Sequence, residues 1–144
     1  MLKVGEILTA VKTVLDADST LDTLLGVTEG ISKIIKGAEL PSGASAPCVN
    51  LVDLTENTVD ADTKLKAFIL AVVVRANTTE YGLIDYDALD DIGNRIYTLL
   101  EDQKINLPTA HQLCLYYENA LTASLDIDMQ DVSIKQYRYR ILVI

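Results

Sequence analysis

The chain has 144 residues, 49 % of them hydrophobic, and its 12 basic and 21 acidic residues give a formal net charge of -9. This acidic surplus argues against binding to nucleic-acid phosphates or to anionic lipid, because both depend on Lys and Arg. The acidic surplus is explained by solubility alone. It would also suit a protein that lines a channel through which DNA passes without binding. The length predicts a single domain, residues 1–144, with one buried core. No stretch approaches the roughly 18 apolar residues of a membrane span, and the amphipathic N-terminus lacks a signal-peptide pattern, so we expect the chain to start out in the cytosol.

Two helices are expected at the start of the chain. Residues 3–16 show the i, i+3, i+4, i+7 spacing of an amphipathic helix. The apolar positions of this helix are Val4, Ile7, Leu8, Val11, Val14 and Leu15. A shorter helix follows, and we expect an N-cap at Ser19 or Thr20 and an end at Gly26. Its apolar positions are Leu21, Leu24 and Leu25.

The middle of the chain predicts a β-hairpin built on one long strand. The pattern favours a weak strand at Ile31–Ile35, a loop rich in Gly, Pro and Ser at Gly37–Pro47, and a strand at Cys48–Thr55. The long strand follows at Lys64–Arg75 (KLKAFILAVVVR), and its continuous apolar run favours burial on both faces. The polar residues Glu56–Thr63 connect the two strands of this antiparallel hairpin.

The clearest amphipathic helix is expected at Asp85–Gln103. Asp85 is the expected N-cap, and acidic residues in the first turns match the helix dipole. The apolar positions of this helix are Ala88, Leu89, Ile92, Ile96, Leu99 and Leu100. A short linker, Lys104–Ala110, is expected to follow it.

Two further strands are expected towards the C-terminus, at His111–Asn119 and Val132–Ile144, with an irregular acidic stretch at Leu121–Asp131 between them. One face of the last strand carries Lys135, Tyr137, Tyr139, Ile141 and Val143. Its other face carries Ile134, Gln136, Arg138, Arg140, Leu142 and Ile144.

This order of elements predicts the α+β class: a mostly antiparallel β-sheet with an N-terminal helix and one long amphipathic helix packed on one face. The apolar strands leave more apolar surface than one helix layer covers. That excess points to oligomerisation.

No constellation of residues predicts catalysis, a metal site or a cofactor. Asp126, Asp128 and Asp131 could meet a hard cation, yet the stretch lacks the spacing, the turn glycine and the late Glu of a calcium loop, so a solvated loop is favoured. The single His111 has no local catalytic signature, and Asp90 and Asp91 are better explained by the helix N-terminus. Phosphate-binding glycine motifs are absent from the sequence.

The two cysteines, Cys48 and Cys114, lie far apart in apolar, strand-like contexts. Two buried, reduced thiols are the favoured interpretation. Two Cys with one distant His make no zinc site.

Charged residues on the predicted strands and hairpin are the candidate interface residues. Arg138 and Arg140 form a basic pair on one face of the last strand. They either meet acidic loops of a neighbouring subunit or form the solvated side of an edge strand.

Several stretches together resemble the tail-terminator and tail-completion (head–tail joining) proteins of tailed bacteriophages. The N-terminal helix ILTAVKTVLDAD runs into STLDTLLG, and a loop rich in Pro, Gly and Ser ends in APCVNLVDL. The long strand KLKAFILAVVVRA leads through a polar loop to the helix YDALDDIGNRIYTLLED. The chain closes with the Tyr/Arg strand KQYRYRILVI. These stretches cover most of the chain.

The resemblance implies a non-enzymatic structural protein of the virion neck, assembled in the host cytoplasm. Six subunits would form a ring that caps the tail tube, ends its polymerisation and provides the docking surface for the capsid connector. The implied partners are the tail tube protein, the head-completion or connector protein and, where a tail has one, the sheath, while DNA passes through the lumen without specific binding. Glu56, Asp60 and Asp62 would face the tube or a neighbouring subunit, and Arg138 and Arg140 would serve a subunit contact.

Other functions remain as alternatives to the terminator. A head-closure or neck adaptor protein, or another protein associated with the tail tube, is the first of these. A small cation-binding module built on Asp126, Asp128 and Asp131 is the second. A hydrolase that uses His111 with a distant carboxylate is the third.

Overall fold

The computed structural model describes residues 3–54, 66–109 and 111–144, and within them the chain forms three α-helices and seven β-strands. The helices are α1 (Val4–Asp16), α2 (Ser19–Leu25) and α3 (Tyr86–Leu100). The strands are β1 (Ile34–Lys36), β2 (Cys48–Asp53), β3 (Lys66–Asn77), β4 (Lys104–Asn106), β5 (Gln112–Ala120), β6 (Ser124–Leu125) and β7 (Val132–Val143). The predicted α+β class is confirmed.

The sheet is built around its two longest strands, β3 and β7, which pair antiparallel over their whole 12-residue lengths. The strand order is β1-β2-β3-β7-β5-β4, with β6 added beside β7. The β1–β2 pair is parallel, whereas the other pairs of described strands are antiparallel. The predicted hairpin is confirmed, because β2 pairs antiparallel with β3.

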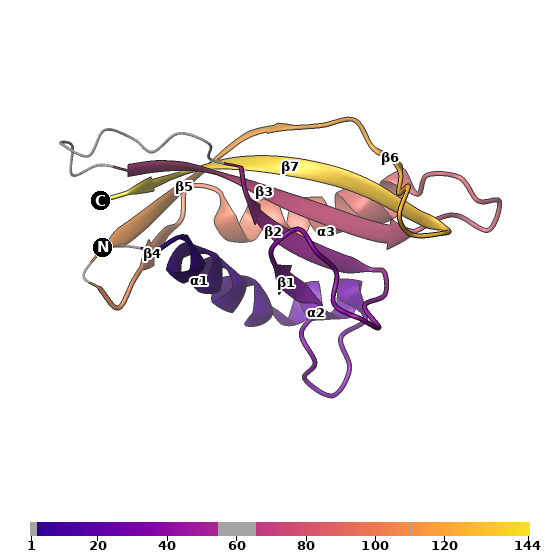
Figure 1. Cartoon of the computed structure of the whole chain (residues 1–144), viewed down its shortest axis with the longest axis horizontal. Coiled ribbons are helices and arrows are strands. Elements are labelled where there is room, and N and C mark those ends of the chain that lie inside the picture. Colours follow the sequence, from indigo (N-terminus) through magenta and orange to yellow (C-terminus); the bar gives the residue numbers. More distant parts are fainter. Residues whose placement is uncertain (1–2, 55–65, 110) are drawn as a thin grey trace.

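The helices form a layer on one side of the sheet (Figure 1). α1 contacts β1 and β2, α3 contacts β3, β5 and β7, and α2 packs against both other helices. This is the one-sided packing that the alternation of apolar and polar residues predicts for an α+β domain. None of the helices in the described residues is long and apolar enough to cross a membrane.

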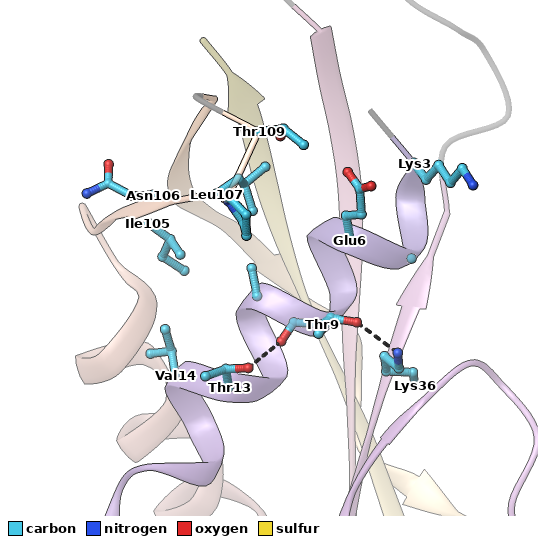
Figure 2. Close-up of a pocket in the computed structure, with 13 residues that line it drawn as sticks. Lys3, Glu6, Thr9, Thr13, Val14, Lys36, Ile105, Asn106, Leu107 and Thr109 are labelled. Carbon is cyan, nitrogen blue, oxygen red and sulfur yellow. Dashed lines mark hydrogen bonds between the residues drawn. The ribbon is translucent and has the colours of Figure 1, made fainter. Parts of the chain in front are cut away.

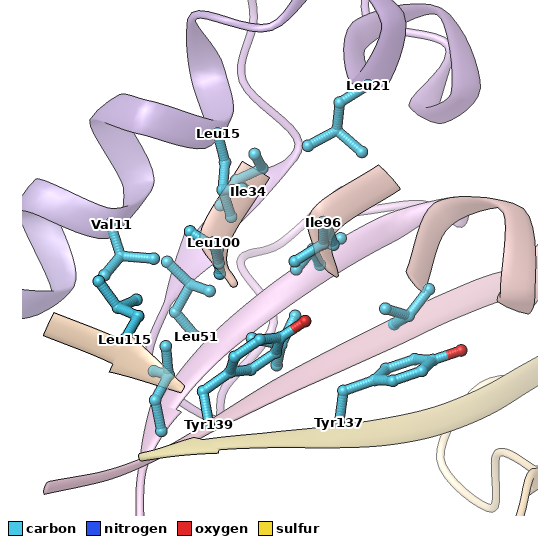
Figure 3. Close-up of a cluster of buried hydrophobic side chains, with 14 of the residues drawn as sticks. Val11, Leu15, Leu21, Ile34, Leu51, Ile96, Leu100, Leu115, Tyr137 and Tyr139 are labelled. Atoms are coloured by element: carbon cyan, nitrogen blue, oxygen red, sulfur yellow. The ribbon is translucent and has the colours of Figure 1, made fainter. Parts of the chain in front are cut away.

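The core lies between this helix layer and the facing side of the sheet (Figure 3). Fully buried members from the helices are Val11, Leu15, Leu21, Ile96 and Leu100, and those from the strands are Leu51, Val72, Leu113, Leu115 and Tyr139. Each such side chain contributes about 1.5–3 kcal/mol through its removal from water. The predicted alternation of the last strand is confirmed, and the face that carries Tyr137, Tyr139, Ile141 and Val143 is the buried one.

Close contact between α3 and β7 depends on Gly93. A Cβ atom at this position would lie 2.3 Å from Cζ and from the hydroxyl of Tyr137, far inside van der Waals contact. The Tyr137 hydroxyl reaches past Gly93 to donate to the carbonyl oxygen of Leu89, at 3.2 Å, and lies 3.0 Å from Oδ1 of Asp90. The missing side chain therefore lets the tyrosine ring pass under the helix.

The helix ends follow local rules, with one correction. Asp85 caps α3 as predicted, since its carboxylate accepts from the N–H of Ala88. α2 also ends as predicted, at Gly26 in the left-handed conformation. The predicted caps of α2, Ser19 and Thr20, were wrong: Asp18 is the N-cap and accepts from the N–H of Leu21 at 2.8 Å. Its carboxylate is held there by Arg95 of α3, at 2.6 and 2.8 Å.

Two strand predictions need correction. Residues 104–110 were expected to be a linker, but Lys104–Asn106 forms β4, which pairs with β5 and is an edge of the sheet. The first strand lies at Ile34–Lys36, later than the predicted Ile31–Ile35, because it forms where the chain meets β2.

Burial of the long strand on both faces was also predicted, and the structure corrects this. Helices cover only the face of β3 that carries Leu70, Val72 and Val74. On its other face Ala71 is buried beside Val52 and Arg138, its register partners, whereas Val73 is only half-buried. A run that is apolar at every position cannot reveal which of its faces receives a helix.

Candidate functional site

The sequence-predicted interface residues fall in two places. Glu56, Asp60 and Asp62 lie outside the described residues. Arg138 and Arg140 lie on β7, on the side of the sheet opposite the helices, because they alternate with the inward-facing Tyr137 and Tyr139.

We call this side of the sheet the outer face. Its members, placed by strand register, include Val52, Ile69, Ala71, Val73, Tyr116, Ile134, Gln136, Arg138, Arg140 and Leu142. Most of these are half-buried, whereas Cys48, Asn50, Arg75 and Cys114 on the same face are buried, and no helix in the described part of the chain lies over the face. Apolar and basic side chains thus share a surface that the helix layer leaves open.

The two arginines differ in how their charges are satisfied. Nε of Arg140 lies 2.8 Å from Oε1 of Glu118, and the Arg140 side chain is 55 % exposed. Nε of Arg138 is buried and has no hydrogen-bond partner among the described residues. A buried donor without a partner costs free energy, so the Arg138 guanidinium is only partly satisfied in the free subunit.

One end of the outer face is held by a buried polar network. Arg75 donates from Nη1 to Oδ1 of Asn50, at 2.5 Å, and from Nε to Oδ2 of Asp126, at 2.8 Å. Asn50 in turn donates to the carbonyl oxygen of Gly37 at 2.8 Å. The network therefore ties β2 and β3 to the loops that begin at Gly37 and Asp126.

The Asp126 carboxylate belongs to this buried network and is not a solvated side chain of the acidic loop. Burial alone would raise the pKa of Asp126, but the N–H of Asp128 and the Arg75 guanidinium outweigh burial and lower the pKa below its ordinary value. The three aspartates weighed as a cation site therefore do not act together, since Asp126 turns towards Arg75. Within the described ranges, no group of three or more His, Cys, Asp or Glu side chains has a metal-binding arrangement.

The candidate catalytic residues have local contacts. The ring of His111 lies at the β4–β5 turn, with Nδ1 3.2 Å from the hydroxyl of Thr109. Asp90 accepts from Nζ of Lys135 at 2.8 Å and from the Tyr137 hydroxyl, and the Lys135 hydrogen bond is the main cause of its lowered pKa. Burial and the neighbouring Asp90 raise the pKa of Tyr137 well above the ordinary value. The contacts of Asp90 with Lys135 and Tyr137 join α3 to β7.

Both cysteines lie on buried strand positions with free thiols, as predicted. Burial raises the pKa of the Cys48 thiol, which makes it a poor nucleophile.

A groove that sequence reasoning missed runs along α1 (Figure 2). It has a volume of about 610 Å³ and lies between α1 and the β4–β5 turn. Its apolar wall includes Ala10, Val14, Ile105, Leu107 and Pro108. No local signal could reveal it, because its walls lie about ninety residues apart in the sequence and one wall contains the unpredicted strand β4.

The polar groups of the groove lie at its rim and in one wall. Lys36 donates to the hydroxyl of Thr9 at 2.8 Å, and Lys3 is exposed near the start of α1. Oε2 of Glu6 is buried and has no hydrogen-bond partner in the part of the chain that the structure describes. The groove is therefore apolar inside, with lysines at its rim and one unsatisfied acceptor.

A comparison with models of known protein families finds no match to this chain, and a comparison with curated protein sequences finds none either. The fold is similar to that of a solved chain from the structure described as "Virion of native gene transfer agent (GTA) particle". The two chains are 17 % identical, the TM-score is 0.72, and the match covers 96 % of this chain and 95 % of the other. At this identity the likeness establishes a shared fold over nearly the whole chain.

Proposed function

We propose that this chain is a non-enzymatic structural protein of a phage-like virion, acting in the neck as a tail terminator. Six copies would form a ring that caps the tail tube, ends its polymerisation and presents the docking surface for the capsid connector. DNA would pass through the lumen of the ring without specific binding.

The observation that carries this proposal is the outer face of the sheet. The central strands β3 and β7 have 12 residues each. On the side that the helix layer leaves open, they carry half-buried apolar side chains and two arginines. Such a surface is stabilised by contact with another chain. The similarity in fold to a chain of a gene transfer agent virion supports a virion protein as the setting.

The proposal assigns Arg138 and Arg140 to a contact with a neighbouring subunit. The acidic surplus of the chain gives every copy carboxylates with which arginines can pair. The polar residues Glu56, Asp60 and Asp62 are proposed to face the tail tube or the neighbouring subunit.

Tail-tube polymerisation tests the role directly. Purified protein is added to polymerising tubes of the cognate phage-like particle, and electron microscopy records tube lengths and capped ends. We expect shorter tubes with a ring on one end. Tubes of unchanged length without added density at their ends would contradict a terminator, and density on isolated connectors alone would identify a neck adaptor instead.

The Arg138→Ala/Arg140→Ala variant tests the assigned contact in the same assay. We expect the variant to fold with the thermal stability of the native chain and to cap few tubes. Lys12→Ala is the control. This variant removes one positive charge and one ion pair, with Asp16 at 2.7 Å, but Lys12 lies on α1, on the helix side of the sheet. Equal capping by the arginine variant and the native chain would remove the outer-face assignment.

A further inference from the structure

The groove along α1 has a chemical counterpart on the same molecule. Three strongly exposed apolar side chains lie in two loops: Ile127 is 96 % exposed, Tyr81 80 % and Leu83 63 %. The N–H of Thr78 donates to the carbonyl oxygen of Asp131 at 2.9 Å, so the β3–α3 loop and the β6–β7 loop are tied together. We call these three side chains the apolar tip.

The tip and the groove lie at opposite ends of the molecule. Along the longest axis, β4 and the start of α1 lie near one end, and β6 and the β3–α3 loop lie near the other (Figure 1). A surface at one end that fits a surface at the other is the requirement for head-to-tail association, whereas a two-fold dimer needs one self-complementary patch.

The charges around the two surfaces are opposite in sign. Asp128 follows Ile127 and Glu80 precedes Tyr81, and both acids are exposed, so the tip is apolar with an acidic border. The groove is apolar with Lys3 and Lys36 among its lining residues. Such a pattern steers the two surfaces together and disfavours tip-to-tip contact.

Glu6 is the one acid among the residues that line the groove, and its buried Oε2 has no hydrogen-bond partner among the described residues. The edge strand β4 offers backbone hydrogen-bonding groups to an extended chain. Ile105 pairs with Leu113 of β5, so the backbone N–H and C=O groups of its neighbours Lys104 and Asn106 point away from β5.

We propose that the apolar tip of one copy of this chain docks into the α1 groove of the next copy, with Ile127 entering the groove. The inference rests on the proposed ring and names the surfaces through which its subunits join. The contact is heterologous, so repeated docking closes into a ring when the rotation between copies allows it. The contact is separate from the outer face, where Arg138 and Arg140 are proposed to form a further contact with a neighbouring subunit.

Disulfide trapping tests the docking. One batch of protein carries Thr13→Cys in the groove and a second carries Ile127→Cys at the tip, and the two are mixed under mild oxidation. Thr13 and Ile127 are exposed, whereas the native Cys48 and Cys114 are buried. We expect a cross-linked heterodimer in the mixture. Ile31→Cys replaces Ile127→Cys in the control, because Ile31 is an apolar side chain that is also well exposed, at 67 %.

A chain that carries both Thr13→Cys and Ile127→Cys tests the docking and the six-fold ring independently. Closed, six-fold cross-linked species support both the docking and the proposed ring. An open ladder, or a closed species of another size, supports the docking and contradicts the six-fold ring. Cross-linking no greater than with Ile31→Cys overturns the docking whatever the oligomeric state.

A charge at the tip gives a second readout. Ile127→Asp is expected to weaken association about tenfold, because it replaces a buried apolar contact by a carboxylate. The thermal stability of the separated subunit is expected to stay unchanged, since Ile127 is 96 % exposed. Unchanged association would contradict the docking.

Discussion

The two faces of the sheet belong to the same strands but have different environments. On the inner face Leu51, Val72 and Tyr139 are completely buried under the helices. On the outer face their neighbours in sequence, Val52, Val73 and Arg138, are half-buried. Because successive side chains of a strand point to opposite faces, one strand contributes both to the core and to a surface. The inner face therefore contributes most of the apolar core, whereas the outer face is only partly covered in the free subunit.

The sharpest test of this difference compares neighbours on β2. Leu51→Ala is expected to lower the free energy of unfolding by about 2–5 kcal/mol, the usual cost of a cavity in a packed core. Val52→Ala, one residue along and on the outer face, is expected to cost about 1 kcal/mol or less in the free subunit. Urea unfolding of both variants gives the two values. Equal losses would show that the outer face is covered in the free protein.

The second test concerns the packing of α3 on the inner face. Gly93→Ala is expected to cost about 1–3 kcal/mol, because its Cβ would lie 2.3 Å from the ring of Tyr137. Gly5→Ala in α1 is the matched control, since no atom lies within 4 Å of its Cβ position, and it is expected to be neutral or to stabilise by up to about 1 kcal/mol. Thermal unfolding measures the stability of both variants. An unchanged stability of Gly93→Ala would contradict the close approach of Tyr137 to α3.

The third test uses the two tyrosines of β7. The Tyr137 hydroxyl is hydrogen-bonded to Leu89 and Asp90, so Tyr137→Phe is expected to cost about 1–2 kcal/mol. The Tyr139 hydroxyl is buried without a partner among the described residues, so Tyr139→Phe is expected to be neutral or stabilising. Its ring keeps the edge-to-face contact with Tyr117, at 5.5 Å between centroids. A reversed order in the measured unfolding free energies would refute this hydrogen-bond assignment.

The fourth and smallest effect is a pH dependence at the outer face. The pKa of Asp126 is lowered in the folded chain, so its contribution to stability is present above the unfolded pKa of about 3.9 and is lost as the pH falls through the folded pKa. Asp126→Asn is therefore expected to make the unfolding free energy depend less steeply on pH in acid. Asp128→Asn is the control, because Asp128 is exposed and lacks the Arg75 contact. Identical slopes for Asp126→Asn and the native chain would contradict the pairing.

Sequence patterns predicted the parts of the fold that are locally encoded. Asp85 was recognised as a cap because it stands directly before an amphipathic helix, and alternation separated Tyr137 and Tyr139 from Arg138 and Arg140. The cap of α2 was placed one residue late, because Asp18, Ser19 and Thr20 are all good caps, and the choice depends on Arg95 from a distant helix.

The parts that sequence reasoning missed depend on contacts between distant segments. β4 has three residues and is a strand only because β5 lies beside it. The α1 groove joins residues from the start of the chain to the β4–β5 turn. Of the five predicted interface residues, Arg138 and Arg140 lie together on the outer face, while Glu56, Asp60 and Asp62 lie outside the described residues.

Native mass spectrometry over a range of concentrations, with and without tail tubes, shows whether this chain is a ring-forming subunit. We expect a dominant species at six times the 15.8 kDa chain mass. A closed dimer or tetramer with two-fold symmetry would contradict it. A monomer that persists at every concentration, even with tail tubes present, would contradict it as well.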